Sequence, residues 1–234
     1  KDNKVTMISD YYKNLDTTPE AGGKSPDDKI RTIRLYKKRD VMNKICIMKG
    51  RLAETDDEIA IDRMYAVNKE IEVGDTITVD GTDFKVTGYT AFPDYSCLFQ
   101  DNNDTMFDSL LFTVGITTEN AYDSLDESKE VFNYAWQYEN EPADKKAEKV
   151  MSDDFLENIV GKIYATGNSL DIYIPRYQNR AINFTGDDLG GDTVMMFTLL
   201  YIVMVIMAFV FAVTTNNTIL KESTVIGTLR ASGY

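Results

Sequence analysis

The chain has 234 residues, a formal net charge of −13 and no histidine. So acidic a chain is a poor binder of polyanions, and we expect no nucleic-acid partner. Without histidine, Ser-His-Asp and Cys-His nucleophile activation and HExxH zinc sites are excluded. The sequence also lacks a GxxxxGKS/T loop and a GxGxxG motif that opens a helix, so any ATP chemistry has to lie on another chain. We therefore expect no enzymatic activity, no catalytic or metal-binding residue and no cofactor.

The chain has two cysteines, Cys46 and Cys97. They form neither a disulfide framework nor a CxxC site for metal or redox chemistry. One bridge between them is conceivable in an oxidising compartment, but we favour two separate buried thiols.

The first part of the chain contains a predicted linker and several short strands. Residues 17–28 are rich in polar residues, glycine and proline, which is typical of a loop. Apolar residues at 30, 33 and 35 and again at 45, 47 and 48 predict two strands, the second followed by a turn at Gly50 and Arg51. Residues 58–65 fit either a strand or a helix, and the sequence leaves that choice open.

The strongest local pattern is a predicted β-hairpin at residues 76–86. Asp80 and Gly81 separate two alternating β-branched runs, and this pair favours a type I′ turn because both turn residues need positive φ. In that register Ile77 faces Phe84, which gives the hairpin one apolar face. Residues 110–116 are a further candidate strand.

Four aromatic residues alternate along residues 131–138: Phe132, Tyr134, Trp136 and Tyr138. If this segment is one strand, all four rings lie on the same face. They then form either a possible aromatic surface that stacks on a ligand or contacts lipid, or the core face of a sheet. We favour the core face.

The segment before the apolar run is predicted to hold a helix, a strand and a turn. Residues 139–149 are charged and compatible with a helix, and the apolar residues at 155, 159, 160 and 163 recur at helical spacing. We expect this amphipathic helix to close one face of the sheet. Residues 170–174 alternate as a last strand. Residues 187–192 predict a Gly/Asp turn, after which Asp192 or Thr193 would cap the next helix.

Acidic residues gather in three places: 54–58, 101–104 and 187–192. A calcium loop needs oxygen ligands at alternating positions, a glycine at the sharp turn and a closing bidentate acid, and no cluster has that pattern. We interpret all three as solvated turns. One alternative is a membrane-tethered hydrolase that uses only an Asp/Glu pair, which would need two acids with abnormal pKa values in a cleft.

Residues 194–213 contain no charge, proline or glycine. A helix of this length spans roughly 30 Å, the thickness of the hydrocarbon core of a bilayer. Apolar residues occupy every face, unlike a core helix of a soluble protein, so we predict a transmembrane helix. Lys221 and Arg230 follow it, whereas Asp187, Asp188 and Asp192 precede it. The positive-inside rule then places the part before the helix outside the cell membrane.

These patterns predict an α+β extracytoplasmic domain with a mixed or antiparallel sheet and flanking helices at residues 1–193. One transmembrane helix at 194–214 and a cytoplasmic coupling segment at 215–234 follow it. The chain begins without methionine and ends shortly after the span, so we expect it to be a piece of a longer polypeptide.

The last residues, 216–234, read NNTILKESTVIGTLRASGY. This segment resembles the cytoplasmic loop that follows the second transmembrane helix in FtsX-like (MacB-type) ABC transporter permeases, where a pattern close to E-x-G-x-L-R-A-x-G recurs. In this chain the glutamate lies five positions before the first glycine. Residues 50–53, 58–62, 73–77 and 84–88 resemble the extracytoplasmic core domain of the same family. The two motif groups lie on opposite sides of the apolar run, as in the family.

The resemblance implies a permease that transmits ATPase-driven movement across the membrane for export or mechanotransmission. It implies as partners an ABC ATP-binding subunit on the cytoplasmic side, a second permease copy or second half, and membrane lipid. It assigns the ATPase-coupling role to residues of the last segment, namely Glu222, Ile226, Gly227, Leu229, Arg230 and Gly233.

The residues of this segment fit a docking role without the family name. A short helix with Leu220, Ile226 and Leu229 on its apolar side could dock in a groove of a soluble partner, where Arg230 could reach a carboxylate. Alternatively, these residues only anchor the end of the helix by snorkelling. At the level of the whole protein, the alternative is a single-pass anchored sensor, adhesion or binding domain.

Overall fold

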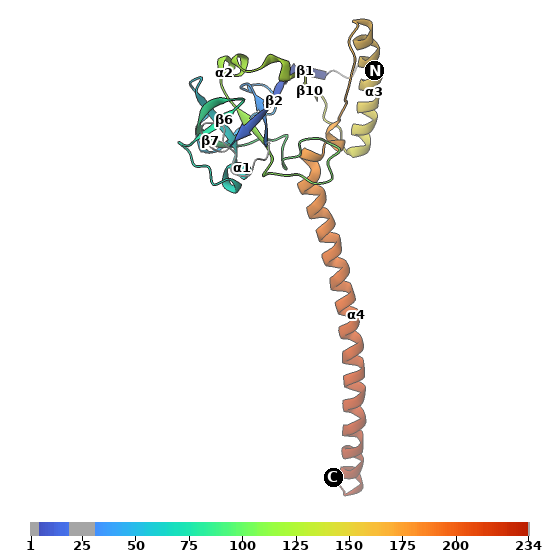
Figure 1. Ribbon diagram of the computed structural model, residues 1–234. Helices are drawn as coiled ribbons and strands as arrows, with labels where there is room; N and C mark the ends of the chain where they lie inside the picture. The colour runs from blue at the N-terminus through green and yellow to red at the C-terminus, as the bar shows by residue number, and fades with distance from the viewer. Residues whose placement is uncertain (1–4, 19–30, 234) are drawn as a thin grey trace. The chain divides into compact units, whose positions relative to one another are not determined.

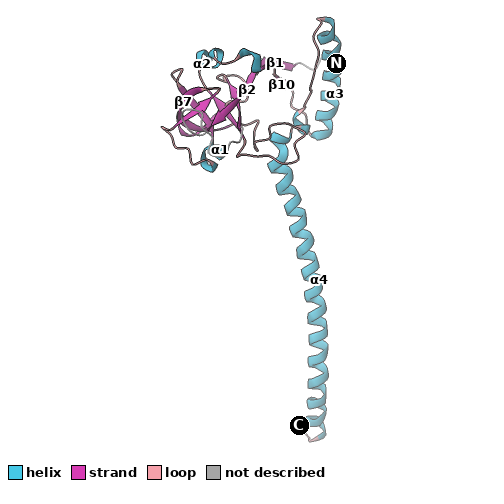
Figure 2. Ribbon diagram, viewed as in Figure 1, coloured by secondary structure: helices cyan, strands magenta, loops and turns pink. Residues whose placement is uncertain are grey.

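A computed structural model describes residues 5–18 and 31–233 of the chain (Figures 1 and 2). The chain divides into two compact units, Lys1–Thr185 and Gly186–Tyr234. Ten strands are described, followed here by their bounds: β1 (Val5–Ser9), β2 (Tyr12–Thr18), β3 (Arg31–Tyr36), β4 (Cys46–Gly50), β5 (Glu58–Asp62), β6 (Thr76–Val79), β7 (Thr82–Ala91), β8 (Phe112–Ile116), β9 (Glu130–Val131) and β10 (Tyr134–Tyr138). The described helices are α1 (Arg63–Asn68), α2 (Glu119–Ser124), α3 (Lys145–Ala165) and α4 (Arg180–Ala231), with short 3-10 turns at Glu127–Lys129 and Arg176–Gln178.

The first unit is an α+β domain, as predicted, and its large sheet closes on itself. The strands follow the order β3-β8-β5-β7-β6-β2, and the pairing of β2 with β3 completes the ring. The β3–β8 and β5–β7 pairs are parallel, and the other pairs of the ring are antiparallel. β9 adds to β2 and β4 adds to β7. Because the ring is closed, its strands have hydrogen-bonding neighbours on both sides. Free edges therefore occur at the added strands β4 and β9.

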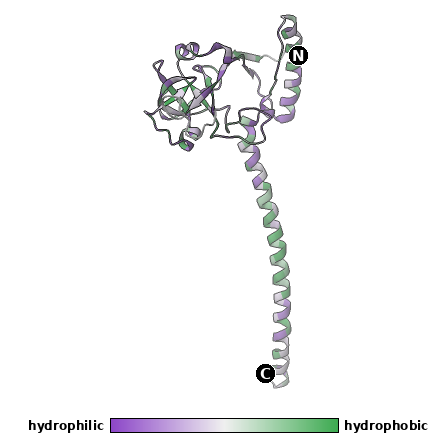
Figure 3. Cartoon of the chain, in the orientation of Figure 1, coloured by the Kyte–Doolittle hydropathy of each residue, from purple (hydrophilic) through white to green (hydrophobic). Residues whose placement is uncertain are grey.

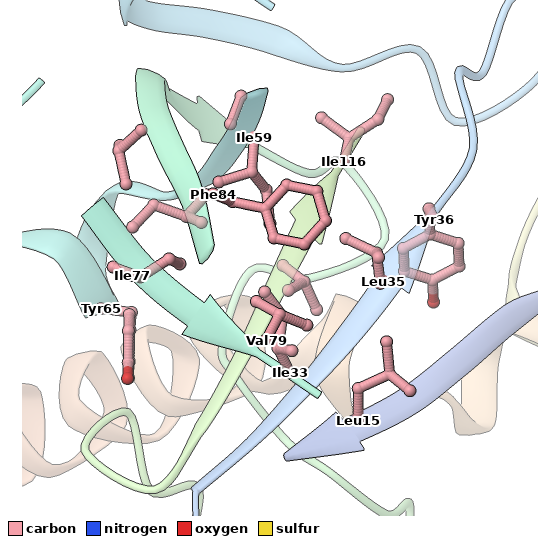
Figure 4. Close-up of a cluster of buried hydrophobic side chains, with 14 of the residues drawn as sticks. Leu15, Ile33, Leu35, Tyr36, Ile59, Tyr65, Ile77, Val79, Phe84 and Ile116 are labelled. Atoms are coloured by element: carbon pink, nitrogen blue, oxygen red, sulfur yellow. The ribbon is translucent and has the colours of Figure 1, made fainter. Parts of the chain in front are cut away.

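The hydrophobic core fills this ring (Figure 4). Its side chains come from every strand of the ring, and Leu15, Ile33, Ile59, Ile77 and Val86 are completely buried. Alternating strand residues point to opposite faces, which is why apolar residues two apart meet in the interior. The buried area of such side chains is the main stabilising contribution to this domain.

The predicted hairpin is confirmed. β6 pairs with β7 in the register that places Ile77 opposite Phe84, and both side chains are buried. Asp80 and Gly81 have φ values of 49° and 78°, as a type I′ turn requires. The turn residues alone therefore fix this register.

Several other expectations concern strands, and the structure confirms most of them. The apolar runs near 33, 47 and 113 are β3, β4 and β8, although Ile30 lies outside the described residues. The sequence left open whether residues 58–65 form a strand or a helix. They form both in succession, because β5 ends at Asp62 and α1 begins at Arg63. The change occurs at Asp62, whose carboxylate accepts hydrogen bonds from the backbone N–H groups of Met64 at 2.7 Å and Tyr65 at 3.3 Å. Of the predicted linker at 17–28, Thr17 and Thr18 belong to β2, and residues 19–28 lie outside the described part.

The single strand expected at 131–138 is wrong. The segment splits at residues 132–133 into β9, which pairs with β2, and β10, which pairs with β1 in a separate two-stranded sheet. Phe132 lies between the two strands, and Tyr134, Trp136 and Tyr138 lie in β10, so the four rings do not share the face of one strand. None of them belongs to the hydrophobic core described above, so the expected core face is also wrong.

The predicted helix is α3, but it does not cover the large sheet. Phe155 of α3 packs against Trp136 of β10, with ring centroids 5.6 Å apart, and against Tyr138. The strand expected at 170–174 is wrong, because these residues have no regular secondary structure. From this segment Tyr173 stacks on Trp136, with centroids 4.9 Å apart and planes 10° apart. The alternating residues Leu170, Ile172 and Ile174 do not form a strand, and Ile172 is exposed.

The second unit consists of α4 from Gly186 onward. α4 is long and apolar enough to cross a membrane. Its most apolar stretch has a mean hydropathy of 2.7 and appears as the green middle of the helix in Figure 3. This stretch is not buried. The turn expected at 187–192 is wrong, because these residues are helical, and the helix begins at Arg180 and not after Asp192 or Thr193. The separate short helix expected near 220–230 is also wrong, because α4 continues unbroken to Ala231.

Candidate functional site: the junction at the start of α4

The first residues of α4, 180–185, are held by the loop between β7 and β8. We call residues 94–107 together with 180–185 the junction. All of it lies within the first unit. The helix starts here because the side-chain oxygen of Asn179 accepts a hydrogen bond from the backbone N–H of Ile182 at 3.3 Å, which is the usual bond of an N-cap.

Main-chain hydrogen bonds join the two sides of the junction. The carbonyl of Ala181 accepts bonds from the backbone N–H groups of Ser96 at 2.7 Å and Cys97 at 3.2 Å. The Ser96 hydroxyl donates to the carbonyls of Ala181 at 2.7 Å and Ile182 at 3.0 Å. The thiol of Cys97 lies 3.4 Å from the hydroxyl of Thr185. These bonds fix the first turn of the helix against the loop.

Arg180 adds a second set of contacts on the same loop. Its backbone N–H donates to the side-chain oxygen of Asn102 at 2.9 Å. Its guanidinium donates to the carbonyl of Asp104 and, at 3.3 Å, to the carbonyl of Thr105. The same group lies over the ring of Phe99, 4.9 Å from its centroid, which is a cation–π contact.

Three rings form the apolar part of the junction: Phe99, Phe107 and Phe184. Their centroids are 5.2 to 5.8 Å apart, and each pair meets edge to face. With Cys97 and Ala181 they make a hydrophobic cluster separate from the core of the closed sheet. Aromatic pairs in this geometry contribute about 0.5–1.5 kcal/mol each beyond the area they bury.

Arg34 of β3 connects the junction loop to the closed sheet. Its guanidinium donates to the hydroxyl of Tyr95 at 2.7 Å, to the carbonyl of Gln100 at 3.0 Å and to the side chain of Asn14 at 3.0 Å. Desolvation opposes the charge of Arg34, but the hydroxyls of Tyr95, Tyr36 and Tyr12 raise its pKa above the ordinary value. Arg34 therefore stays charged, and its hydrogen bonds to Tyr95 and Gln100 connect the junction loop to β3.

A buried ion-pair network makes the second connection. Arg39 is bidentate to Asp10, with both bonds at 2.8 Å, and donates to Asp94 of the junction loop at 2.9 Å. Its guanidinium also lies 3.7 Å from the centroid of the Tyr36 ring. Burial raises the pKa of Asp10 despite the attraction of Arg39. Burial alone would lower the pKa of Arg39, but the charge of Asp94, the Tyr36 hydroxyl and the charge of Asp10 raise it.

The sequence patterns did not identify the junction. Ser96, Phe99 and Phe107 lie in a loop without periodicity, and their partners in α4 follow about 80 residues later in the chain, as the separation of 88 positions between Cys97 and Thr185 illustrates. The only available sign was the density of aromatic residues in a segment that otherwise reads as a polar loop.

The residues with a predicted coupling role lie in the second unit. Glu222, Ile226, Gly227, Leu229 and Arg230 are part of α4 and exposed, and Gly233 follows the helix with a φ of 89°. Arg230 lies in the last turn, where a cation interacts favourably with the helix dipole. Gly227 has open space where a Cβ would be, so its surface permits close approach by a partner.

The four aromatic residues separate into two groups. Phe132 and Tyr134 are exposed and meet the ring of Tyr11 edge to face, and the Tyr11 and Tyr134 hydroxyls lie 2.7 Å apart. Trp136 and Tyr138 are half-buried under α3. The possible aromatic surface is therefore limited to the first pair and Tyr11.

Two acidic residues of the 54–58 cluster have hydrogen-bond partners, and both cysteines are free thiols. Glu58 is ion-paired with Arg51, and Asp56 accepts a hydrogen bond from Thr118. Among the described residues, no group of three or more Cys, Asp or Glu side chains could hold a metal ion. Cys46 and Cys97 are separate free thiols, as predicted, but Cys46 is exposed and not buried.

Comparison with known proteins adds one solved structure. The crystal structure of the extracellular domain of a noncanonic ABC-type transporter, YknZ, from Gram-positive bacteria is similar to this chain at 12% sequence identity and a TM-score of 0.38. The similarity covers 68% of this chain and 78% of that one. No protein-family model and no curated protein matches the sequence.

Proposed function

We propose that this chain is part of a permease subunit of an ABC transporter complex. In this role it transmits conformational change driven by a cytoplasmic ATPase to a domain outside the cell membrane, for export or mechanotransmission. The observation that carries the proposal is the continuity of α4. This helix begins in the junction, contains the apolar run and ends with the residues that resemble the coupling loop of FtsX-like (MacB-type) permeases.

The length of α4 supports a role that crosses the membrane. Its 52 residues extend roughly 78 Å at about 1.5 Å per residue, against the roughly 30 Å of a hydrocarbon core. A membrane-spanning α4 would therefore reach into water on both sides. Basic residues near one end, Lys221 and Arg230, favour the cytoplasm for that end, and the acidic domain then lies outside.

The contacts of the junction support transmission over simple anchoring. A flexible tether would suffice to hold a domain at a membrane, whereas the junction fixes the helix start with main-chain bonds, Arg180 and three rings. Arg34 and Arg39 connect this loop to the closed sheet. Within the first unit, a displacement of residues 180–185 would thus be passed to the closed sheet through this loop.

The proposal assigns no chemistry to this chain and assigns three partners to the assembly. The exposed end of α4 presents Ile226 and Leu229 beside Arg230, which suits docking in a groove of an ATP-binding subunit with a carboxylate for the arginine. A second permease copy or second half and the lipid bilayer complete the assembly.

The test uses the full-length protein in its native membrane. We expect Arg230→Glu or Leu229→Glu to abolish copurification with the ATP-binding subunit and to reduce stimulation of its ATPase activity by about tenfold or more, because a charge is reversed or inserted at the docking surface. Lys162→Glu, on the exposed surface of α3, is the matched charge control and should change neither. Unchanged copurification and ATPase activity in both α4 variants would contradict the coupling role.

Orientation has its own test. Protease added to intact cells should digest the acidic domain while the cytoplasmic end of α4 remains protected. Complete protection of the domain would reverse the proposed topology.

A further inference from the structure

The strand β4 is added to the outside of the closed sheet and is exposed along its whole length. All five residues, Cys46–Gly50, are exposed, including Ile47 and Met48, which are about half accessible to solvent. Within the described part of the chain, β4 pairs with β7 alone. Its other edge therefore presents backbone N–H and C=O groups that are free to pair with another strand.

The surroundings of β4 are basic in an otherwise acidic chain. Residues 37–51 contain six basic residues and a single acid, Asp40, whereas the whole chain has a net charge of −13. Arg39 and Arg51 are engaged with buried or half-buried carboxylates, and Lys37 and Lys38 pair with exposed acids. Lys44 is exposed and has no ion pair with any other described residue, and Lys49 lies over the ring of Tyr89 at 5.2 Å. These two lysines border the strand at its start and near its end.

A cavity adjoins the start of the strand. It has a volume of about 270 Å³, and Lys38 and Lys44 line it together with the apolar side chains of Ile45, Leu52 and Ile116. Asp40 and Arg39 also line it. Asp40 pairs with Lys38, and Arg39 pairs with Asp10 and Asp94, so Lys44 is the lining cation that has no ion pair with a described residue. The cavity lies just before the strand, because its lining residue Ile45 directly precedes Cys46.

We propose that the free edge of β4 binds an extended acidic segment of a partner protein as an added strand. Main-chain hydrogen bonds to the edge supply affinity, and Lys44 and Lys49 select acidic side chains. An anionic lipid surface would satisfy the lysines but not the backbone groups of the edge. A second copy that pairs β4 with β4 would bring the same lysines together, and their repulsion opposes that arrangement.

The experiment measures binding of a labelled peptide of alternating glutamate and valine to the full chain in detergent micelles. We expect Lys44→Glu/Lys49→Glu to weaken binding by about tenfold or more, because two attractive charges become repulsive. Lys146→Glu/Lys162→Glu on α3 makes the same change in net charge on exposed positions and should alter binding by less than about twofold. If circular dichroism shows that Lys44→Glu/Lys49→Glu is unfolded, Lys44→Gln/Lys49→Gln replaces it. That variant should still weaken binding severalfold.

A second form of the peptide tests the strand geometry. N-methylation of alternate peptide groups keeps every charge and removes backbone donors, so it should reduce affinity by about tenfold. Equal binding of the methylated peptide, or equal weakening by both glutamate double variants, would overturn the proposal.

Two further results would assign the edge to another occupant and would also overturn the proposal. One is binding to phosphatidylglycerol vesicles that depends on Lys44 and Lys49 while the peptide fails to bind. The other is self-association of the chain that Lys44→Glu/Lys49→Glu abolishes in the absence of peptide.

Discussion

The carbonyl of Ala181 accepts hydrogen bonds from both the backbone N–H and the hydroxyl of Ser96, each at 2.7 Å. Two donors from one residue on one acceptor fix the direction of the first turn of α4 relative to the junction loop. The ring contacts of Phe184 with Phe99 and Phe107 hold the same turn to the same loop.

Phe184→Ala should loosen the junction without unfolding the closed sheet. Phe184 is half-buried, so the loss of its ring contacts should cost about 2 kcal/mol locally. Hydrogen exchange at the amides of Ser96 and Cys97 should then accelerate on the order of tenfold, while amides of β3 and β8 keep their protection. Leu189→Ala, on an exposed part of α4, is the control. Unchanged exchange at Ser96 and Cys97 would show that the rings do not hold the junction.

Arg39→Met should be strongly destabilising. It leaves the buried carboxylate of Asp10 and the partly buried carboxylate of Asp94 without their cation, which typically costs about 3–5 kcal/mol. Lys38→Met, at the exposed neighbouring position, should change the free energy of unfolding by less than about 0.5 kcal/mol. Urea titration at neutral pH measures both.

The pH dependence of the unfolding free energy of Arg39→Met identifies why this variant is destabilised. Burial raises the pKa of Asp10, and without Arg39 the charge that offsets this effect is lost, so Asp10 binds a proton more readily in the folded than in the unfolded state. The deficit should therefore shrink as pH falls from neutral towards about 4. A deficit that is constant with pH would mean that lost packing, and not unpaired charge, destabilises the variant.

Gly88→Ala should destabilise the sheet where β4 leaves β7. A Cβ at Gly88 would lie 2.4 Å from the carbonyl oxygen of Arg51 and 2.8 Å from that of Lys49, and both are backbone atoms that cannot move independently. Overpacking of this kind costs about 1–3 kcal/mol or more. Gly161→Ala in α3 meets open space and should instead stabilise by about 0.5–1 kcal/mol. Equal effects of the two substitutions in thermal or urea unfolding would contradict this close approach.

Glu58 should contribute to stability in a defined pH range. Hydrogen bonds from Arg51, and then from the backbone N–H of Glu54, lower the pKa of Glu58 from 4.5 to about 2. A carboxyl with a lowered pKa in the folded state stabilises above its unfolded value, and this contribution is lost as pH falls from 4.5 towards 2. The difference in unfolding free energy between the wild type and Glu58→Gln should therefore be full at pH 6 and shrink across that range. A difference that stays constant from pH 6 to pH 2 would contradict this contribution of Glu58.

Local signals in the sequence were sufficient where structure depends on neighbours in the chain. The Asp80-Gly81 pair sets the turn and register of the β6–β7 hairpin because only residues with accessible positive φ fit there. In the segment 58–65, Asp62 marks the change from strand to helix, because aspartate caps helices well and is unfavourable inside a strand.

Two predictions from local signals failed, each for a different reason. The glycines and aspartates at 187–192 suggested a turn, but each glycine costs a helix only about 1 kcal/mol. Ending and restarting the helix there would leave several unpaired N–H and C=O groups at each new terminus, which costs more. Residues 170–174 alternate like a strand, yet Tyr173 instead stacks on Trp136, and no neighbouring strand is present to pair with it among the described residues.

The sequence by itself determined the apolar run, the acidic domain before it and the absence of histidine chemistry, because these depend only on composition and order. Only the tertiary structure decided the closure of the sheet through β2 and β3, the pairing of β9 with β2 and of β10 with β1, and the attachment of Arg180 and Phe184 to the β7–β8 loop. Each of these joins residues far apart in the chain, and their contact free energies exist only once the intervening segments have folded.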